Sequence, residues 1–283
     1  MEINDLFALQ IFTVVCLFAV SVLGTAVPLR LRAYLKGDAF DTALSLANST
    51  TVGIFLATGM GHMLVHCATG LAAAGRPLET SLQYATMLCL AGFVLTLVIE
   101  KVVLHGAPHD HAIGSDSGGG DSTVPVFLAI VLAVHGVLEG IAMGVEKTSS
   151  SLRVVLVGMV PHKFFTGIAL GISLQKYSAT TTSAVRVAVS WATATPGGVL
   201  LGMILVSGFS GGSMDAALQG LASGTFLYIS ICEILHEEFS ATATRGFNAA
   251  KVSCVVGGML LAFWLEGHAH AKEGGTPHEH HHD

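Results

Sequence analysis

The sequence predicts an all-α membrane protein with eight transmembrane helices. Its 283 residues are 52% hydrophobic and only 11% charged, whereas a soluble domain usually carries about 25% charged residues. Eight apolar runs in the chain each approach the roughly 20 residues that a helix needs to cross the hydrocarbon core. Because a spanning backbone must satisfy its own polar groups, and the runs are too long for barrel strands, each run is expected to be a helix.

The eight runs follow one another along the chain and are separated by polar connections. They cover roughly residues 7–29, 46–72, 82–104, 124–145, 152–174, 184–207, 216–236 and 247–266. Glu2 and Asp5 precede the first run and Arg30 follows it, which is the reverse of a signal peptide with its basic start. When the loops are assigned to alternating sides, one side holds more lysine and arginine. These loops are expected to be cytoplasmic, with both termini outside.

Spans two, three and seven carry ionisable side chains near their ends. His62 and His66 on span two are four residues apart and share a helix face. Span three ends in Glu100, and span seven ends in Glu233 and His236, which are one helical turn apart. We expect these groups to be metal-binding stations on either side of a central site. A packing role is the alternative for each single histidine.

Spans four and five carry nearly the same ten-residue pattern, HGVLEGIAMG from His135 and HKFFTGIALG from His162. An imidazole in hydrocarbon is costly unless it has a partner or lines a cavity. Because residues four apart share a helix face, Glu139 points the same way as His135, and Thr166 follows His162 in the same frame. Two imidazoles and a carboxylate suit Zn²⁺ and are acceptable to Fe²⁺ or Mn²⁺. Thr166, a backbone carbonyl or water is expected to complete the shell.

Two prolines predict interrupted helices near this pattern. Pro161 in span five removes one backbone hydrogen bond and leaves the carbonyl of Val157 without its usual donor. Pro196 in span six is followed by two glycines and predicts a second break. Broken helices at membrane depth are typical of transporter substrate sites.

Small residues and one lysine also mark the middle spans. Pairs of glycines at 140/144 and 167/171 predict that spans four and five pack closely against each other or against a third helix. Lys163 follows the histidine of span five directly. Its ammonium group either opposes a second metal ion beside the first, or reaches a membrane interface or a carboxylate.

The chain is expected to form a single transmembrane domain over residues 1–283. Residues 105–123, rich in Gly, Ser and His, predict a flexible cytoplasmic loop. Residues 267–283 predict a His-rich extracytoplasmic tail. The histidines of the loop either capture a metal loosely or belong to an inert linker, and those of the tail are candidates for weak metal binding. The histidine run at 280–282 is either native or an added tag.

These motifs resemble those of the ZIP family of divalent-metal transporters. His135 with Glu139 is similar to the family's fourth-helix motif, and His162-Lys163 followed by GIALG is similar to its fifth. The stretch FLATGMGHML in span two resembles the family's second helix, and ASGTFLYISICEIL in span seven is very close to its seventh. The resemblance covers nearly all eight spans.

The resemblance implies a 3+2+3 helix bundle, both termini outside and uptake toward the cytoplasm. It implies a transport site between helices four and five, at His135, Glu139 and His162. Many relatives hold two metal ions, using a polar residue after the fourth-helix histidine and a carboxylate on helix five. Gly136 stands at the first of these places and Lys163 and Thr166 at the others, which favours a single ion.

We therefore expect a transporter that imports zinc by alternating access, with no resident cofactor. The His-Lys pair resembles animal zinc carriers, while the end of helix five is similar to plant iron carriers, so import of Fe²⁺ or of a broad range of divalent cations is the alternative. The expected partners are the ion and the lipid bilayer, and the expected location is the plasma membrane. Nucleic acid is excluded because the chain has no basic stripe. A homodimer is one of the open oligomeric states.

Two other classes of protein also bury histidines. An intramembrane metalloenzyme would need a general base beside its ligands, but the signature His-Glu-x-x-His occurs in no span, and Glu139 lies four residues after His135. We therefore expect the protein not to be an enzyme. A structural or receptor-like bundle would explain one hydrogen-bonded histidine, but it explains two in a repeated frame poorly.

Overall fold

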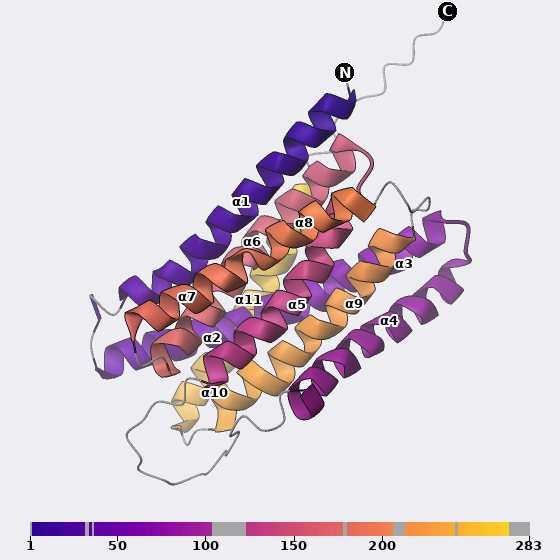
Figure 1. Ribbon diagram of the computed structural model, residues 1–283. Coiled ribbons are helices and arrows are strands. Elements are labelled where there is room, and N and C mark those ends of the chain that lie inside the picture. Colours follow the sequence, from indigo (N-terminus) through magenta and orange to yellow (C-terminus); the bar gives the residue numbers. More distant parts are fainter. Residues whose placement is uncertain are drawn as a thin grey trace, which may run out of the picture.

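The computed structural model of the protein is a bundle of long helices (Figure 1). It describes residues 2–31, 34–35, 37–103, 123–177, 180–205, 213–240 and 243–271. Within these ranges the chain is almost entirely helical and contains no strand. The loop predicted at 105–123 lies outside the described residues except for Thr123. Of the tail predicted at 267–283, residues 267–271 belong to the last helix and the remainder lies outside the described residues.

Eight spans in the described chain are long and apolar enough to cross a membrane, which confirms the predicted number. Four spans are single helices, namely α1 (Glu2–Leu31), α5 (Thr123–Gly144), α6 (Ser149–Tyr177) and α11 (Arg245–Ala271). The other four are compound: α2 (Asp38–Ala57) with η1 (Thr58–Met63) and α3 (Leu64–Ala73); α4 (Leu78–Val98) with η2 (Ile99–Val103); α7 (Thr181–Ala192) with α8 (Ala194–Leu205); and α9 (Met214–Tyr228) with η3 (Ile229–Leu235) and α10 (His236–Ser240).

The segments η1, η2 and η3 are π-helical, a feature that the hydrophobic pattern did not predict. A π-helical turn inserts an extra residue and re-aims the side chains that follow, and such turns are frequent at functional sites. His62 lies on η1, Glu100 on η2 and Glu233 on η3. Three of the ionisable groups outside the central pattern therefore sit where the helix is widened.

The two predicted helix breaks had different outcomes. The break at Pro161 was wrong, because α6 continues through this residue from Ser149 to Tyr177. One missing hydrogen bond is tolerated in a membrane helix when its neighbours hold it in place, and α6 packs along α1. Span six is interrupted as predicted, at Thr193 between α7 and α8. Pro196 itself lies in the first turn of α8, where an amide hydrogen would lack an intrahelical acceptor in any case.

Glycines bring four pairs of helices into close contact. A Cβ atom added to Gly224 of α9 would lie 1.8 Å from the carbonyl oxygen of Cys89 on α4. The glycines predicted to promote packing do so against third helices: Gly140 and Gly144 face α8, and Gly167 faces α1. A glycine contact of the same kind joins α2 to α11. At these points the two backbones approach too closely for any side chain to fit between them.

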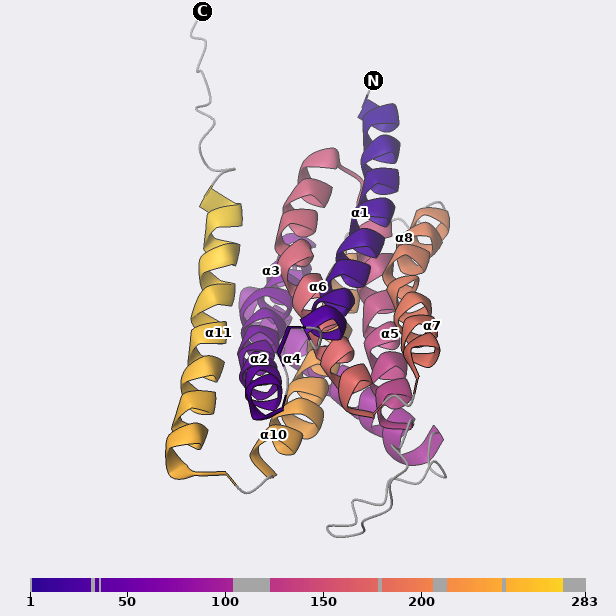
Figure 2. The same ribbon diagram turned by 90° about the vertical axis from the view of Figure 1, so that its left-hand side faces the viewer.

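The helices form two units that meet through side chains. The α5–α6 unit contains α1, α5, α6, α7 and α8, and the α9 unit contains α2, α3, α4, α9, α10 and α11 with the π-helical segments. Figure 2 shows α11 and α2 on one side and α1, α5, α7 and α8 on the other. The units touch where α5 packs on α9 and where α6 packs on α2 and α11. For none of the described glycines would an added Cβ atom lie within 3 Å of a backbone atom in the other unit.

A buried carboxylate ties the two units together at the end of the bundle where α10 begins. Glu238 accepts hydrogen bonds from Ser45 Oγ at 2.6 Å and from Asn48 Nδ2 at 2.7 Å, both on α2. Lys251 of α11 and Lys176 of α6 lie 3.5 Å and 3.2 Å from its oxygens. Lys176 comes from the other unit, so this ion pair crosses the boundary.

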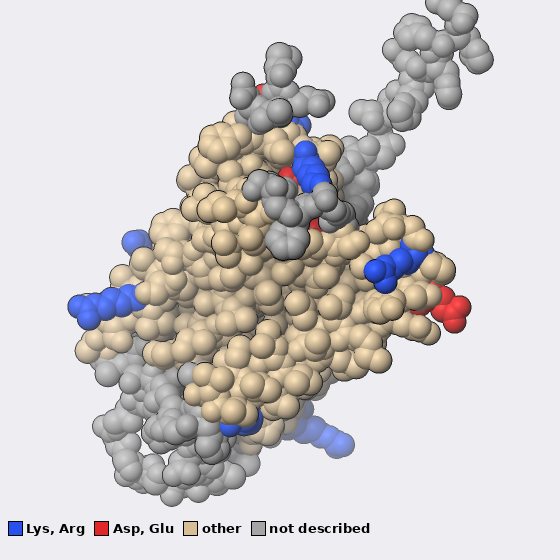
Figure 3. Space-filling view, turned by 45° about the vertical axis from the view of Figure 1, so that its right-hand side comes forward, with Lys and Arg blue, Asp and Glu red and all other residues tan. Residues whose placement is uncertain are grey.

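Apolar side chains cover the outside of the bundle. Met87 and Leu90 on α4 are exposed, as are Val256 and Leu260 on α11. In Figure 3 the charged side chains lie near the margins of the face, and the broad surface between them is uncharged. Lipid tails favour such a surface, so the chain is an integral multi-pass membrane protein.

The glycine contact between α9 and α4 yields a stability prediction. Gly224→Ala should lower the free energy of unfolding by about 1–3 kcal/mol, because an added methyl group overpacks the contact. Thermal unfolding of the purified protein in detergent measures the effect. Gly257→Ala on α11 is the matched control, since a Cβ atom there meets nothing within 4 Å. Equal unfolding temperatures for the two variants would contradict the packing account.

Candidate metal centre

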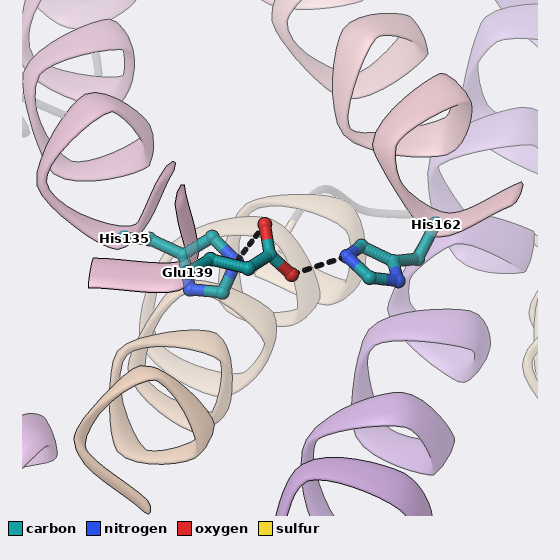
Figure 4. A group of neighbouring side chains, drawn as sticks. All are labelled: His135, Glu139 and His162. Atoms are coloured by element: carbon teal, nitrogen blue, oxygen red, sulfur yellow. Dashed lines mark hydrogen bonds and ion pairs between the residues drawn. The ribbon is translucent and has the colours of Figure 1, made fainter. Parts of the chain in front are cut away.

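Three side chains from α5 and α6 converge inside the bundle (Figure 4). His135 and Glu139 come from α5 and His162 from α6, and one ligand atom from each lies within 4.8 Å of the others. His162 Nε2 is 2.5 Å from Glu139 Oε1, and His135 Nε2 is 3.6 Å from Glu139 Oε2. All three residues are buried, with exposed fractions of 0%, 0% and 3%. The spacing of four residues and the repeated frame thus put the predicted side chains in one place.

Lys163 completes the surroundings of the carboxylate. Its Nζ atom lies 2.8 Å from Glu139 Oε2, and the residue is fully buried. Of the positions predicted for the Lys163 side chain, the structure shows the one in which it pairs with a carboxylate. Gly136 leaves room beside it, because a Cβ atom there would lie 2.6 Å from Thr195 Oγ1 and 3.6 Å from Lys163 Nζ.

Helix α9 closes the site on the side of His135. His135 Nδ1 lies 2.7 Å from Thr225 Oγ1 and 3.2 Å from the carbonyl oxygen of Ala222. The ring of Phe226 stacks on His135 with centroids 3.8 Å apart and stacks in turn on Phe55 at 4.6 Å. Sequence reasoning did not single out Thr225 or Phe226. The available signal was the run of small and polar residues ASGT, which ends in Thr225 and lies inside an apolar span.

Two buried imidazole nitrogens at the centre have no hydrogen-bond partner within the described residues, His135 Nε2 and His162 Nδ1. His135 Nε2 faces the carboxylate of Glu139. This is the position from which its lone pair would coordinate an ion between the two side chains. Thr166 is also buried, and its hydroxyl donates to the carbonyl oxygen of His162 at 2.7 Å. A ligand role for Thr166 therefore stays a prediction that would use the remaining lone pair of its oxygen.

His62 and His66 lie apart from the three converging side chains, in the α9 unit. Their ring centroids are 6.2 Å apart. His62 faces α6, because its Nε2 atom would lie 3.5 Å from a Cβ atom placed on Gly158. Gly158 is one helical turn before His162, so His62 approaches α6 on the stretch next to the centre. The predicted metal-binding role of the two histidines stays a prediction.

The acidic groups predicted near the ends of spans three and seven meet one another. Glu100 is buried, accepts a hydrogen bond from the Tyr228 hydroxyl and pairs with Lys101. Its carboxyl group lies close to that of Glu233. His236 is exposed at the start of α10. This cluster is separate from the three converging side chains, and binding of an ion by Glu233 and His236 stays a prediction.

Comparison with known proteins gives one consistent result. The profile of the family described as "ZIP Zinc transporter" matches residues 114–266. "Zinc transporter ZIP2" of Mus musculus is 28% identical over 88% of this chain and 96% of its own length. "Zinc transporter ZIP3" of Homo sapiens is 26% identical over 90% and 98%, and "Zinc transporter ZIP1" of Homo sapiens is 26% identical over 92% and 88%. The family profile covers more than half of the chain, so the protein belongs to the ZIP zinc transporter family.

Proposed function

We propose that this protein carries a divalent metal ion, zinc first of all, across the membrane through a site formed by His135, Glu139 and His162. The observation that carries the proposal is the convergence of three buried ligand atoms within 4.8 Å. Membership in a family of zinc transporters supports metal transport as the activity. Two imidazoles and one carboxylate form the ligand set of many zinc sites that keep a position open. A transporter needs such incomplete ligation because the ion must leave again.

The site is best suited to one ion at a time. Lys163 holds one oxygen of Glu139 at 2.8 Å, and its positive charge repels a second dication. The neighbouring places are taken by Gly136 and Thr195, which supply no negative charge. The other oxygen of Glu139 bonds directly to His162 Nε2 at 2.5 Å. An entering ion would separate this pair and replace its hydrogen bond with two coordinate bonds.

The packing of the bundle supports transport by alternating access. His135, Glu139 and His162 all lie on the α5–α6 unit, while Phe226 faces them from the α9 unit. Glycine contacts join α5 to α8 and α6 to α1, and Glu139 joins α5 to α6 through His162 and Lys163. The boundary between the units is made by side chains without such glycine contacts. A slide of the α5–α6 unit along α9 would move the site as one body. The ion pair of Lys176 with Glu238 would have to open during such a slide.

The orientation of the bundle in the membrane follows from the charge distribution of the sequence, and inward transport is proposed from the resemblance to the ZIP family. We infer that the end of the bundle carrying α10 faces the cytoplasm, since lysine and arginine are more frequent in the connections on that side. Both termini are then outside, and zinc moves inward across the plasma membrane. The three central residues are buried, so the described state is closed toward both sides.

The first prediction of this proposal concerns the two histidines. His135→Ala or His162→Ala should abolish saturable uptake of zinc into vesicles containing the purified protein, because each removes one of three ligands. Gly257→Ala on α11 is the control, since this residue is exposed, lies outside every predicted metal-binding position, and an added Cβ atom there meets nothing within 4 Å; saturable uptake should remain. Competition by Fe²⁺, Mn²⁺ and Cd²⁺ in the same vesicles tests the choice of metal. Normal zinc uptake by both alanine variants would contradict the assignment of the metal site to these histidines.

The second prediction concerns stoichiometry. The wild type should bind one zinc ion per chain more than the His135→Ala/His162→Ala double variant, because the ammonium group of Lys163 excludes a second ion. Metal analysis after dialysis against the same free zinc concentration measures the difference. Zinc bound by histidines elsewhere in the chain cancels in this comparison. A difference of two ions per chain would contradict the single-ion site.

A further inference from the structure

We infer that Thr225 is a positioning residue that holds His135 ready to bind the metal ion, and that this hold lasts only while α9 faces α5 as it does here. The inference rests on the proposed function and extends it to the release of the ion. Thr225 does not belong to the predicted ligand set and comes from the other unit.

The hydrogen bonds around His135 decide which of its nitrogens carries the proton. The carbonyl oxygen of Ala222 is 3.2 Å from Nδ1 and can only accept. The hydroxyl of Thr225 donates to the same carbonyl at 2.7 Å, so its oxygen is free to accept from Nδ1 at 2.7 Å. Nδ1 therefore carries the hydrogen, and Nε2 keeps a lone pair for the ion. This assignment follows from the partners of the ring, which is how a histidine tautomer is inferred.

The hydrogen bond from His135 Nδ1 to Thr225 affects how tightly His135 can bind a metal ion. A ligating histidine nearly always donates its second ring N–H to a fixed acceptor, and loss of that acceptor typically costs about 10–100-fold in metal affinity. Phe226, the residue after Thr225, holds the plane of the same ring by stacking at 3.8 Å. His162 has no comparable support, because its Nδ1 atom lacks a hydrogen-bond partner among the described residues. His135 is thus the pre-oriented ligand of the pair.

The bond between His135 and Thr225 crosses the boundary between the two units. Next to Thr225, Gly224 packs against the backbone of Cys89 on α4, and the Ser223 hydroxyl donates to the carbonyl oxygen of Gly59 at 2.8 Å. Thr225 is therefore fixed to the α9 unit, whereas His135 moves with α5. A slide by the rise of two helical residues, about 3 Å, would stretch a bond of 2.7 Å to about 4 Å, beyond hydrogen-bonding range. Movement of the units would then weaken the binding of the ion by His135 and favour its release.

Isosteric substitution tests the inference. Thr225→Val keeps the volume and removes the hydroxyl, so it should weaken zinc binding by about 10–100-fold and raise the KM of uptake by a similar factor without lowering the maximal rate. Thr225→Ser keeps the hydroxyl and should stay close to wild type. Thr25→Val is the matched control, because Thr25 is a buried threonine whose hydroxyl donates within α1, to the carbonyl oxygen of Ser21. Equilibrium binding of zinc to the full-length protein and uptake into vesicles are both measured.

The outcomes separate this inference from the proposed function. Wild-type affinity in Thr225→Val, or equal weakening in Thr225→Ser or Thr25→Val, overturns the role of the Thr225 hydroxyl. If that happens while His135→Ala still abolishes zinc uptake, the proposed function stands without this inference. If the wild type shows no saturable uptake, the proposed function fails. The binding series then still decides whether Thr225 supports His135.

Discussion

The carboxylate of Glu139 lies deep inside the bundle, and the arrangement of the central helices depends on it. A charge at membrane depth is costly unless other groups compensate it. His162 and Lys163 of α6 each approach one of its oxygens, at 2.5 Å and 2.8 Å. Both come from the same turn, so α6 can satisfy the carboxylate only in one register against α5. The cost of burying the charge therefore becomes a constraint on how two helices meet, and the same constraint brings together the three side chains proposed as metal ligands.

A second constraint separates what is rigid from what can move. Glycines such as Gly140 and Gly224 let backbones touch, and these contacts lie inside the two units. Helices joined in this way have no side chains between them that could rearrange. The boundary between the units is made instead by side chains such as Phe226, and by the ion pair that Lys176 forms at one end. Side-chain contacts can be exchanged one at a time, which supports the proposed slide of the α5–α6 unit along α9.

Much of the fold and of the candidate site was predictable from the sequence, because these features depend on the spacing of residues along the chain. The eight spans follow from the length of the apolar runs, and the grouping of His135 with Glu139 follows from the helical period. The π-helical segments were not predictable, because they reflect tertiary packing rather than composition. Thr225 was not predicted as part of the site, because its partner His135 lies 90 residues away in the chain. Spacing could not decide the partner of Lys163, and local chemistry overstated the effect of Pro161, which the packing of α6 overrides.

The most direct test of the account is the coordination shell of zinc bound to the full-length protein. X-ray absorption at the zinc edge, taken as the difference between wild type and the His135→Ala/His162→Ala double variant, isolates the central ion. The account predicts two imidazole nitrogens and carboxylate oxygen at about 2.0–2.2 Å. Sulfur in the first shell, or a spectrum that does not change between the two proteins, would contradict it.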